Sequence, residues 1–164
     1  MHTSPRSLFA LLALCLVVQS TSAATYEITV TRKGSNVYRV DGKSIIVQTR
    51  NCYVYAYSEE ALLKSGGYGG EIIFIGSRDK CDIKAIYGKA TPAAGKYTVR
   101  VTREDDDWYE VQGSNLYLQT SMCLSLALGQ EGFLSLNAGG NGRLVFEDGQ
   151  SCMVESVHSK MRLE

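Results

Sequence analysis

Apolar and polar side chains alternate along short stretches of the chain, which is the pattern of β-strands with one buried face. Three such stretches follow one another within about 25 residues: Tyr26–Arg32, Tyr38–Val40 and Ile45–Thr49. Asp41-Gly42, between the second and third stretches, is a residue pair typical of a tight β-hairpin. The pattern predicts strands throughout and no long amphipathic helix.

The same pattern occurs twice in the chain. A shift of 71 positions lays Tyr26–Tyr87 on Tyr97–His158 without a gap and gives 15 identities in 62 positions. Chance would give about 4 identities at typical residue frequencies. We interpret this repeat as an internal duplication.

Tyr53, Tyr55 and Tyr57 form an alternating triad that by itself resembles a ladder for stacking sugars or bases. The second copy has leucine at the same three positions: Leu124, Leu126 and Leu128. A face that accepts either three tyrosines or three leucines is most simply a buried face. We therefore expect these side chains in the core, with the tyrosine hydroxyls reaching its rim.

The element after this triad is ambiguous. Glu59–Lys64 favours a helical turn by local propensity, whereas its counterpart Gln130–Leu136 contains a glycine and favours an extended strand. Glycine-rich loops follow in both copies and lead to further predicted strands: Ile72–Ile75, Leu144–Phe146, Asp82–Tyr87 and Met153–His158.

Five to seven short strands in a unit of about 62 residues predict an all-β fold, either a small barrel or a sandwich. We expect a tandem duplication of a disulfide-stapled unit, with repeats at residues 25–88 and 96–160 and a linker at 89–95 that contains Pro92. The alternative is one pseudo-symmetric domain in which both copies share a core. The short linker allows either arrangement.

The first 24 residues have the layout of a secretory signal peptide. His2 and Arg6 precede an apolar run, Leu8–Val18, and small polar residues follow it. The run of 11 residues is too short for a membrane span, which needs about 20. A lipid-anchored form through Cys15 is disfavoured by the bulky Leu14 before it. The sequence predicts a secreted or periplasmic protein with no transmembrane segment after cleavage.

Four cysteines remain after removal of the signal peptide, and an even number in an exported protein predicts disulfides. Of the three pairings, the repeat favours Cys52–Cys81 and Cys123–Cys152, because a duplicated unit should carry its own bridge. Each bridge would close a loop of about 30 residues and contribute roughly 3–4 kcal/mol. A four-thiolate metal site would need close C-x-x-C spacing, which is missing.

Charge excludes few function classes but differs between the halves. The mature chain has 16 basic and 17 acidic residues, a balance that does not indicate nucleic-acid binding. Residues 25–95 carry a net charge of +3 and residues 96–164 a net charge of −4. Opposite charges would help the halves dock or two chains associate. Neutral drift of solvated surfaces is the simpler interpretation.

The inventory of reactive side chains argues against catalysis. His158 is the one histidine of the mature chain, and we expect it on the surface or on an edge strand. Glu60 and Glu131 match between the copies, but a requirement of the fold explains them as well as a glycosidase pair does. The acidic run Glu104–Asp107 lacks a calcium-loop pattern and is expected to be a solvated hairpin tip. We therefore predict no enzyme, no cofactor and no metal.

Two aromatic residues are difficult to place in the core. Tyr68 stands in a glycine-rich loop, and Trp108 falls on the face opposite Tyr109. Both are candidate surface anchors for binding, since interfaces are enriched in Tyr and Trp. The simpler interpretation, which we favour, is a plain loop residue for Tyr68 and a contact between domains for Trp108. We expect the repeated Arg32/Arg103 and the repeated Gln-Thr pairs to bind carboxylates or strand ends inside each unit, and the alternative is a repeated binding feature.

These observations predict an exported, non-enzymatic binding protein that recognises another protein, for example as an inhibitor of an enzyme. The alternative is a module that attaches to cell-wall or extracellular glycan, with Tyr68 and Trp108 as the residues to test. A small hydrolase is disfavoured by the residue inventory.

Overall fold

The computed structural model describes residues 24–66 and 69–162, and these residues form twelve β-strands and no helix. The predicted signal peptide lies almost wholly outside the described residues. Six strands build lobe 1: β1 (Thr25–Gly34), β2 (Val37–Val40), β3 (Ile45–Arg50), β4 (Glu59–Gly66), β5 (Gly69–Phe74) and β6 (Lys80–Ala90). Six more build lobe 2: β7 (Gly95–Asp105), β8 (Trp108–Val111), β9 (Leu116–Ser121), β10 (Gln130–Leu136), β11 (Gly142–Phe146) and β12 (Ser151–Met161).

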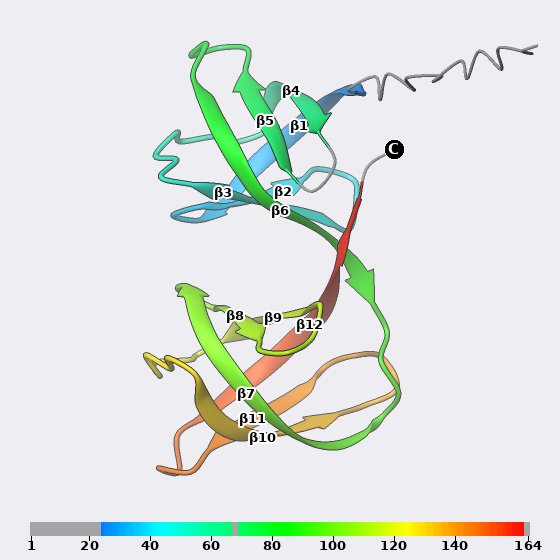
Figure 1. Ribbon diagram of the computed structural model, residues 1–164, viewed down its shortest axis with the longest axis vertical. Coiled ribbons are helices and arrows are strands. Elements are labelled where there is room, and N and C mark those ends of the chain that lie inside the picture. Colours follow the sequence, from blue (N-terminus) through cyan, green and yellow to red (C-terminus); the bar gives the residue numbers. More distant parts are fainter. Residues whose placement is uncertain (1–23, 67–68, 163–164) are drawn as a thin grey trace, which may run out of the picture.

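Antiparallel pairing closes each lobe into a small barrel. Lobe 1 runs β1-β2-β3-β6-β5-β4 and returns to β1, and lobe 2 runs β7-β8-β9-β12-β11-β10 and returns to β7. The predicted all-β class is therefore confirmed. Figure 1 shows the lobes one above the other, joined along one side by the long strands β6 and β12.

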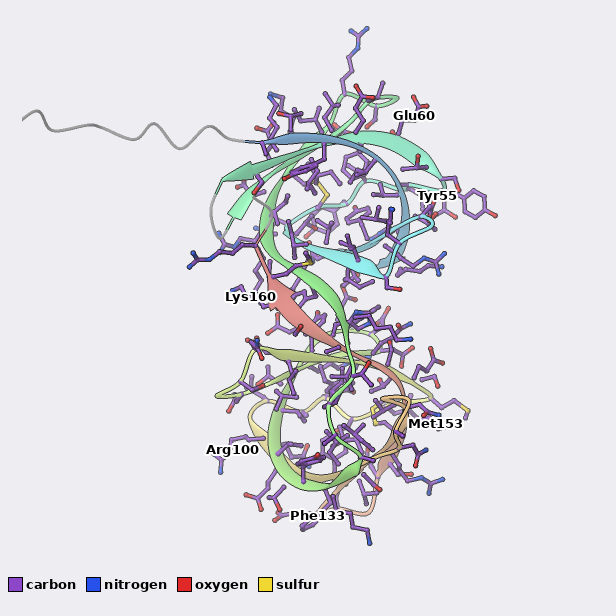
Figure 2. The ribbon with its side chains drawn as sticks, turned by 90° about the vertical axis from the view of Figure 1, so that its right-hand side faces the viewer. Tyr55, Glu60, Arg100, Phe133, Met153 and Lys160 are labelled. Atoms are coloured by element: carbon purple, nitrogen blue, oxygen red, sulfur yellow. A yellow bond between two sulfur atoms is a disulfide. The ribbon has the colours of Figure 1, made fainter. Side chains whose placement is uncertain are left out.

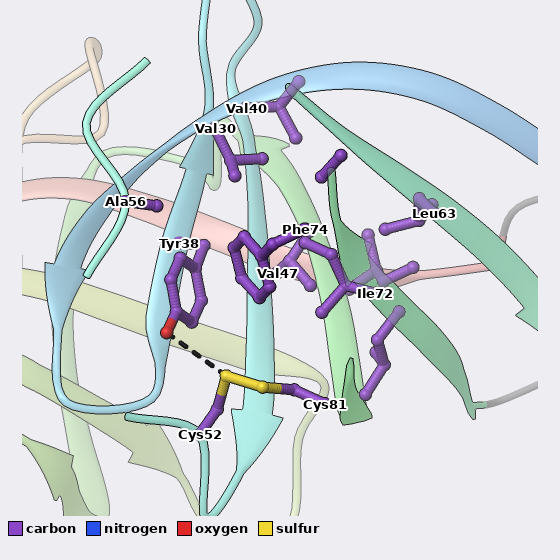
Figure 3. Close-up of a cluster of buried hydrophobic side chains, with 13 residues drawn as sticks. Val30, Tyr38, Val40, Val47, Cys52, Ala56, Leu63, Ile72, Phe74 and Cys81 are labelled. Atoms are coloured by element: carbon purple, nitrogen blue, oxygen red, sulfur yellow. Dashed lines mark hydrogen bonds between the residues drawn. A yellow bond between two sulfur atoms is a disulfide. The ribbon is translucent and has the colours of Figure 1, made fainter. Parts of the chain in front are cut away.

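Each lobe has its own hydrophobic core. In lobe 1, Tyr38, Val47 and Phe74 are fully buried beside the Cys52–Cys81 disulfide (Figure 3). Tyr109, Leu118 and Phe146 occupy the corresponding cluster of lobe 2. Burial of each large apolar side chain contributes about 1.5–3 kcal/mol. The lobes are thus two units with separate cores, rather than one barrel.

Both predicted disulfides are confirmed. Cys52 bonds to Cys81, and Cys123 bonds to Cys152, each across a sequence separation of 29. Each bridge ties the segment that follows the third strand of its lobe to the start of the last strand. Two such bridges are compatible with an oxidising, extracellular compartment.

The lobes correspond strand for strand, but the ungapped alignment is wrong at β5 and β11. Ile72 pairs with Cys81, whereas Leu144 pairs with Cys152, so these strands match at a shift of 72. The pair Leu134–Leu144 spans one residue more than its counterpart Leu63–Ile72. The pair Leu144–Cys152 spans one residue fewer than Ile72–Cys81. Runs of glycine hide this shift in the sequence.

The ambiguous segment Glu59–Lys64 belongs to β4, so a helical turn there is wrong. It pairs with β1 on one side and β5 on the other. Pairing on both edges outweighs the helical preference of EEALLK, which is a fraction of a kcal/mol per residue.

A third buried cluster lies between the lobes. It consists of Val37, Ile46, Ala85, Tyr87, Trp108 and Tyr117. The rings of Tyr87 and Tyr117 stack with centroids 4.5 Å apart, and the ring of Trp108 also stacks on Tyr117, with centroids 5.6 Å apart. The ends of β6 and β12 also pair directly, and this pairing makes one continuous twelve-stranded sheet.

Polar side chains complete the contact between the lobes. The Gln48 amide donates to the Tyr117 hydroxyl at 3.1 Å and accepts from the Tyr87 hydroxyl at 3.3 Å. Lys84 forms an ion pair with Glu104. The backbone N–H of Asn36 donates to the Asp105 carboxylate at 2.8 Å. The acidic run is therefore not simply a solvated hairpin tip, because its first two carboxylates bind lobe 1.

Candidate functional site

Two extended segments with matching geometry stand out from the barrels. Residues 51–58 connect β3 to β4, and residues 122–129 connect β9 to β10. Both begin and end in the left-handed region: φ is 49° at Asn51 and 47° at Ser58, and 53° at Met122 and 65° at Gly129. Between these turns the side chains alternate between the barrel and solvent.

The outward side chains are large and almost fully exposed. Tyr53, Tyr55 and Tyr57, here called the Tyr ladder, are 77%, 81% and 80% exposed. The Leu ladder consists of Met122, Leu124, Leu126 and Leu128, which are 76%, 87%, 79% and 87% exposed. The prediction that these positions lie in the core is wrong. The side chains do alternate between two faces, but the tyrosines and leucines face solvent and the residues between them face the barrel.

The disulfide cysteines determine which side chains of each segment point into the barrel. Cys52 and Ala56 are buried in lobe 1, as are Cys123 and Ala127 in lobe 2. A cysteine bonded across the barrel must point inward, so its neighbours at odd spacing point outward. The sequence held this signal, because the inward Cys and Ala are identical at a shift of 71 positions while the outward residues differ.

Buried tyrosine hydroxyls hold the inner edge of each segment. Tyr38 donates to the Val54 carbonyl at 2.8 Å, and Tyr109 donates to the Ser125 carbonyl at 2.6 Å. Burial raises the pKa of both hydroxyls, so they remain protonated donors. Backbone bonds add to this anchorage, from Arg32 N to Ala56 O at 2.8 Å and from Arg103 N to Ala127 O at 2.7 Å.

The outer edge of each segment has no such partners. Among the described residues, no hydrogen bond involves the backbone of Tyr53, Tyr55 or Tyr57, and the same is true of Leu124, Leu126 and Leu128. In an extended chain, the N–H and C=O of alternate residues point to the same edge. Each ladder therefore combines exposed side chains with an open row of backbone donors and acceptors.

The two ladders share one side of the molecule. Figure 1 shows residues 51–58 in teal and residues 122–129 in yellow, both at the left-hand edge of their lobes. Tyr55 points away from lobe 1 in Figure 2. A groove of about 300 Å³ runs between Tyr55, Tyr57 and Arg32 on lobe 1 and Asp106 on lobe 2. The Tyr ladder thus borders the junction of the lobes.

The repeated polar residues act mainly inside each lobe, as expected. Arg32 donates to the carbonyls of its own hairpin turn at Gly34 and Ser35, and Arg103 does the same at Asp105 and Asp106. Gln48 is different, because it binds across the junction to Tyr117.

The two candidate anchors do not join this surface. Trp108 is 2% exposed and lies in the cluster between the lobes, 5.6 Å from the Tyr117 ring. Trp108 is therefore not a surface anchor, and the contact between domains that the sequence favoured for it is what the structure shows. Its face is covered because lobe 1 packs on it. Tyr68 lies outside the described residues.

His158 is also misplaced by the sequence argument. It is 5% exposed on β12, its ring lies 5.8 Å from Trp108, and its Nε2 is 2.9 Å from the Ser156 hydroxyl. Burial, with a smaller contribution from Lys89, lowers the pKa of His158 to about 4. The ring is therefore neutral at physiological pH, and it packs beside Trp108 at the junction between the lobes.

Within residues 24–66 and 69–162, no cluster of His, Cys, Asp and Glu is arranged to hold a metal ion. The same residues contain no helix that could cross a membrane. Comparison with protein families, with curated proteins and with solved structures finds no match for this chain.

Proposed function

We propose that this chain is an exported, non-enzymatic protein that binds another protein through the Tyr and Leu ladders. One observation carries the proposal: seven large side chains with exposures of 76% to 87% lie on two anchored segments whose outer backbone edges are unpaired. Contiguous exposed apolar side chains on a soluble protein mark interaction sites.

The ladders are built as interface anchors. Tyrosine contributes a large contact area and loses little conformational entropy when it is fixed. The segments that carry the ladders are already fixed by a disulfide, a tyrosine hydroxyl and left-handed turns at both ends. Pre-ordering of this kind lowers the entropic cost of association.

The open backbone edge favours a protein partner over a glycan. An extended peptide offers N–H and C=O groups at the spacing of a strand, and strand addition to an open edge is a recurrent mode of protein recognition. The glycan alternative depended on Trp108 and Tyr68, and Trp108 is buried. Export is supported by the layout of residues 1–24 and by the two disulfides.

The test is a capture experiment with the oxidised chain from residue 25 as bait, offered secreted extract and purified cell wall in parallel. We expect a stoichiometric protein partner that is lost from the triple variant Tyr53→Ser, Tyr55→Ser, Tyr57→Ser, or from the corresponding triple leucine variant. Phe133→Ser is the matched control, because Phe133 is 55% exposed on β10, outside both ladders. Retention by cell wall without a protein partner would overturn the proposal.

A further inference from the structure

Lobe 1 has an opening into its barrel that is independent of the ladders. β1 pairs with β4 from Thr25 to Val30 and with β2 from Val30 onward, so it changes partner at Val30. Where β1 parts from β2, a cavity of about 820 Å³ opens between β1, β4 and the hairpin that joins β2 to β3. Small-molecule sites typically have volumes of about 300–1,000 Å³.

The interior of this cavity is apolar. Ile28, Val40, Ile45, Val47 and Leu63 line it. Figure 3 shows Val40, Val47 and Leu63 in the same cluster as the lobe 1 core, so the cavity is continuous with that core. Ile28 and Ile45 are only partly buried. An apolar body entering here would cover them and gain roughly 25 cal/mol for each Å² removed from water.

The rim of the cavity is acidic. Of the described residues that line it, Glu27, Asp41 and Glu60 are acidic and Lys43 is basic. Asp41 already accepts hydrogen bonds from Thr31 and Ser58 at 2.9 Å and 3.0 Å. Glu27 and Glu60 make no ion pair among the described residues. The two exposed carboxylates favour a positively charged group at the mouth.

We propose that lobe 1 binds a small cationic amphiphile, with its apolar body inside the barrel and its cationic head beside Glu27 and Glu60. The positive charge of the ligand follows from Glu27 and Glu60, which have no ion-pair partner among the described residues, whereas Asp41 pairs with Arg39 at 3.8 Å. Lobe 2 offers a contrast: at the positions of Glu27, Asp41, Lys43 and Glu60 it has Thr98, Gln112, Ser114 and Glu131. The acidic rim, and with it the preference for a cation, belongs to lobe 1.

The experiment compares two probes with the same twelve-carbon chain and opposite heads, dodecyltrimethylammonium and dodecanoate. The oxidised chain from residue 25 is first loaded with the neutral fluorescent dye N-phenyl-1-naphthylamine. Each probe is then added below its micelle concentration, and the loss of dye fluorescence is measured. We expect the cation to displace the dye at a concentration about tenfold lower than the anion, as two screened charge pairs would give.

Charge variants on the exposed rim test the site without disturbing the core. Glu27→Gln with Glu60→Gln should abolish the advantage of the cation, while the corresponding lobe 2 variant Glu131→Gln should preserve it. Equal displacement by both probes, no displacement by either, or an unchanged preference in the double variant would overturn the proposal. Ile45→Trp at the mouth should weaken both probes together, and unaltered binding in that variant would also contradict it.

Discussion

Gly88 pairs with Ser159 where β6 meets β12, and these two residues occupy the same position in their respective lobes, 71 residues apart. The pairs on either side are Ile86 with Met161 and Ala90 with Val157. Because Ile86 corresponds to Val157 and Ala90 to Met161, each pair repeats the other with the two lobes exchanged. Ala90 and Met161 each pack against the core of the other lobe. Each lobe therefore contributes the corresponding surface to the contact, as the subunits of a two-fold symmetric dimer do.

The junction depends on Gln48. Gln48→Ala would leave the hydroxyls of Tyr87 and Tyr117 without their partner in a buried site, at a cost of about 1–3 kcal/mol. Gln119→Ala is the matched control, because Gln119 is the counterpart of Gln48 and its bonds to Glu155 and Ser156 are partly exposed. Urea unfolding of both variants measures the difference. Equal losses would show that the network does not stabilise the junction.

The buried hydroxyls of Tyr38 and Tyr109 stabilise the two segments that carry the ladders. Tyr38→Phe should lower the free energy of unfolding by about 1–2 kcal/mol, because the Val54 carbonyl loses its donor. Tyr109→Phe should do the same through Ser125. Tyr53→Phe removes a solvent-exposed hydroxyl and should change stability by less than about 0.5 kcal/mol. A loss in Tyr53→Phe as large as in Tyr38→Phe would refute this assignment.

Each disulfide stabilises its own lobe. Replacing Cys52 and Cys81 by alanine opens a loop with a sequence separation of 29 and should cost roughly 3–4 kcal/mol. Because each lobe has a separate core, thermal unfolding of this variant should show lobe 1 melting before lobe 2. The reciprocal variant at Cys123 and Cys152 should reverse the order. A single coincident transition in both variants would contradict this independence.

Stability should fall in mild acid because of His158. Its pKa is about 4 in the folded chain and about 6.5 when unfolded, so between these values the unfolded state binds the additional proton. The free energy of unfolding should decrease as pH falls from about 6.5 to about 4, by up to about 3 kcal/mol, and this contribution then levels off. His158→Gln should have a flatter profile in this window. An identical slope would exclude His158 as the cause.

The sequence pattern and its match at a shift of 71 predicted most of the fold but not which side of each segment faces solvent. Cysteine spacing and the shift of 71 were sufficient for the disulfides and for the order of strands. Hydrophobicity alone misplaced Tyr53, because a period of two fixes which residues share a face without saying which face is buried. His158 was misplaced for another reason. It pairs with Lys89 of the opposite lobe, and nothing local in the sequence reports that contact.

The Tyr ladder is solvent-exposed, and we propose that it recognises a protein. Hydroxyl-radical footprinting with mass spectrometry, on the free chain and on its complex with the captured partner, tests it most directly. In the free chain we expect rapid oxidation of Tyr53, Tyr55 and Tyr57, and protection of Tyr38, Tyr109 and Tyr117, which are fully buried. The partner should then protect the ladder. Slow oxidation of the ladder in the free chain, or an unchanged rate in the complex, would contradict the account.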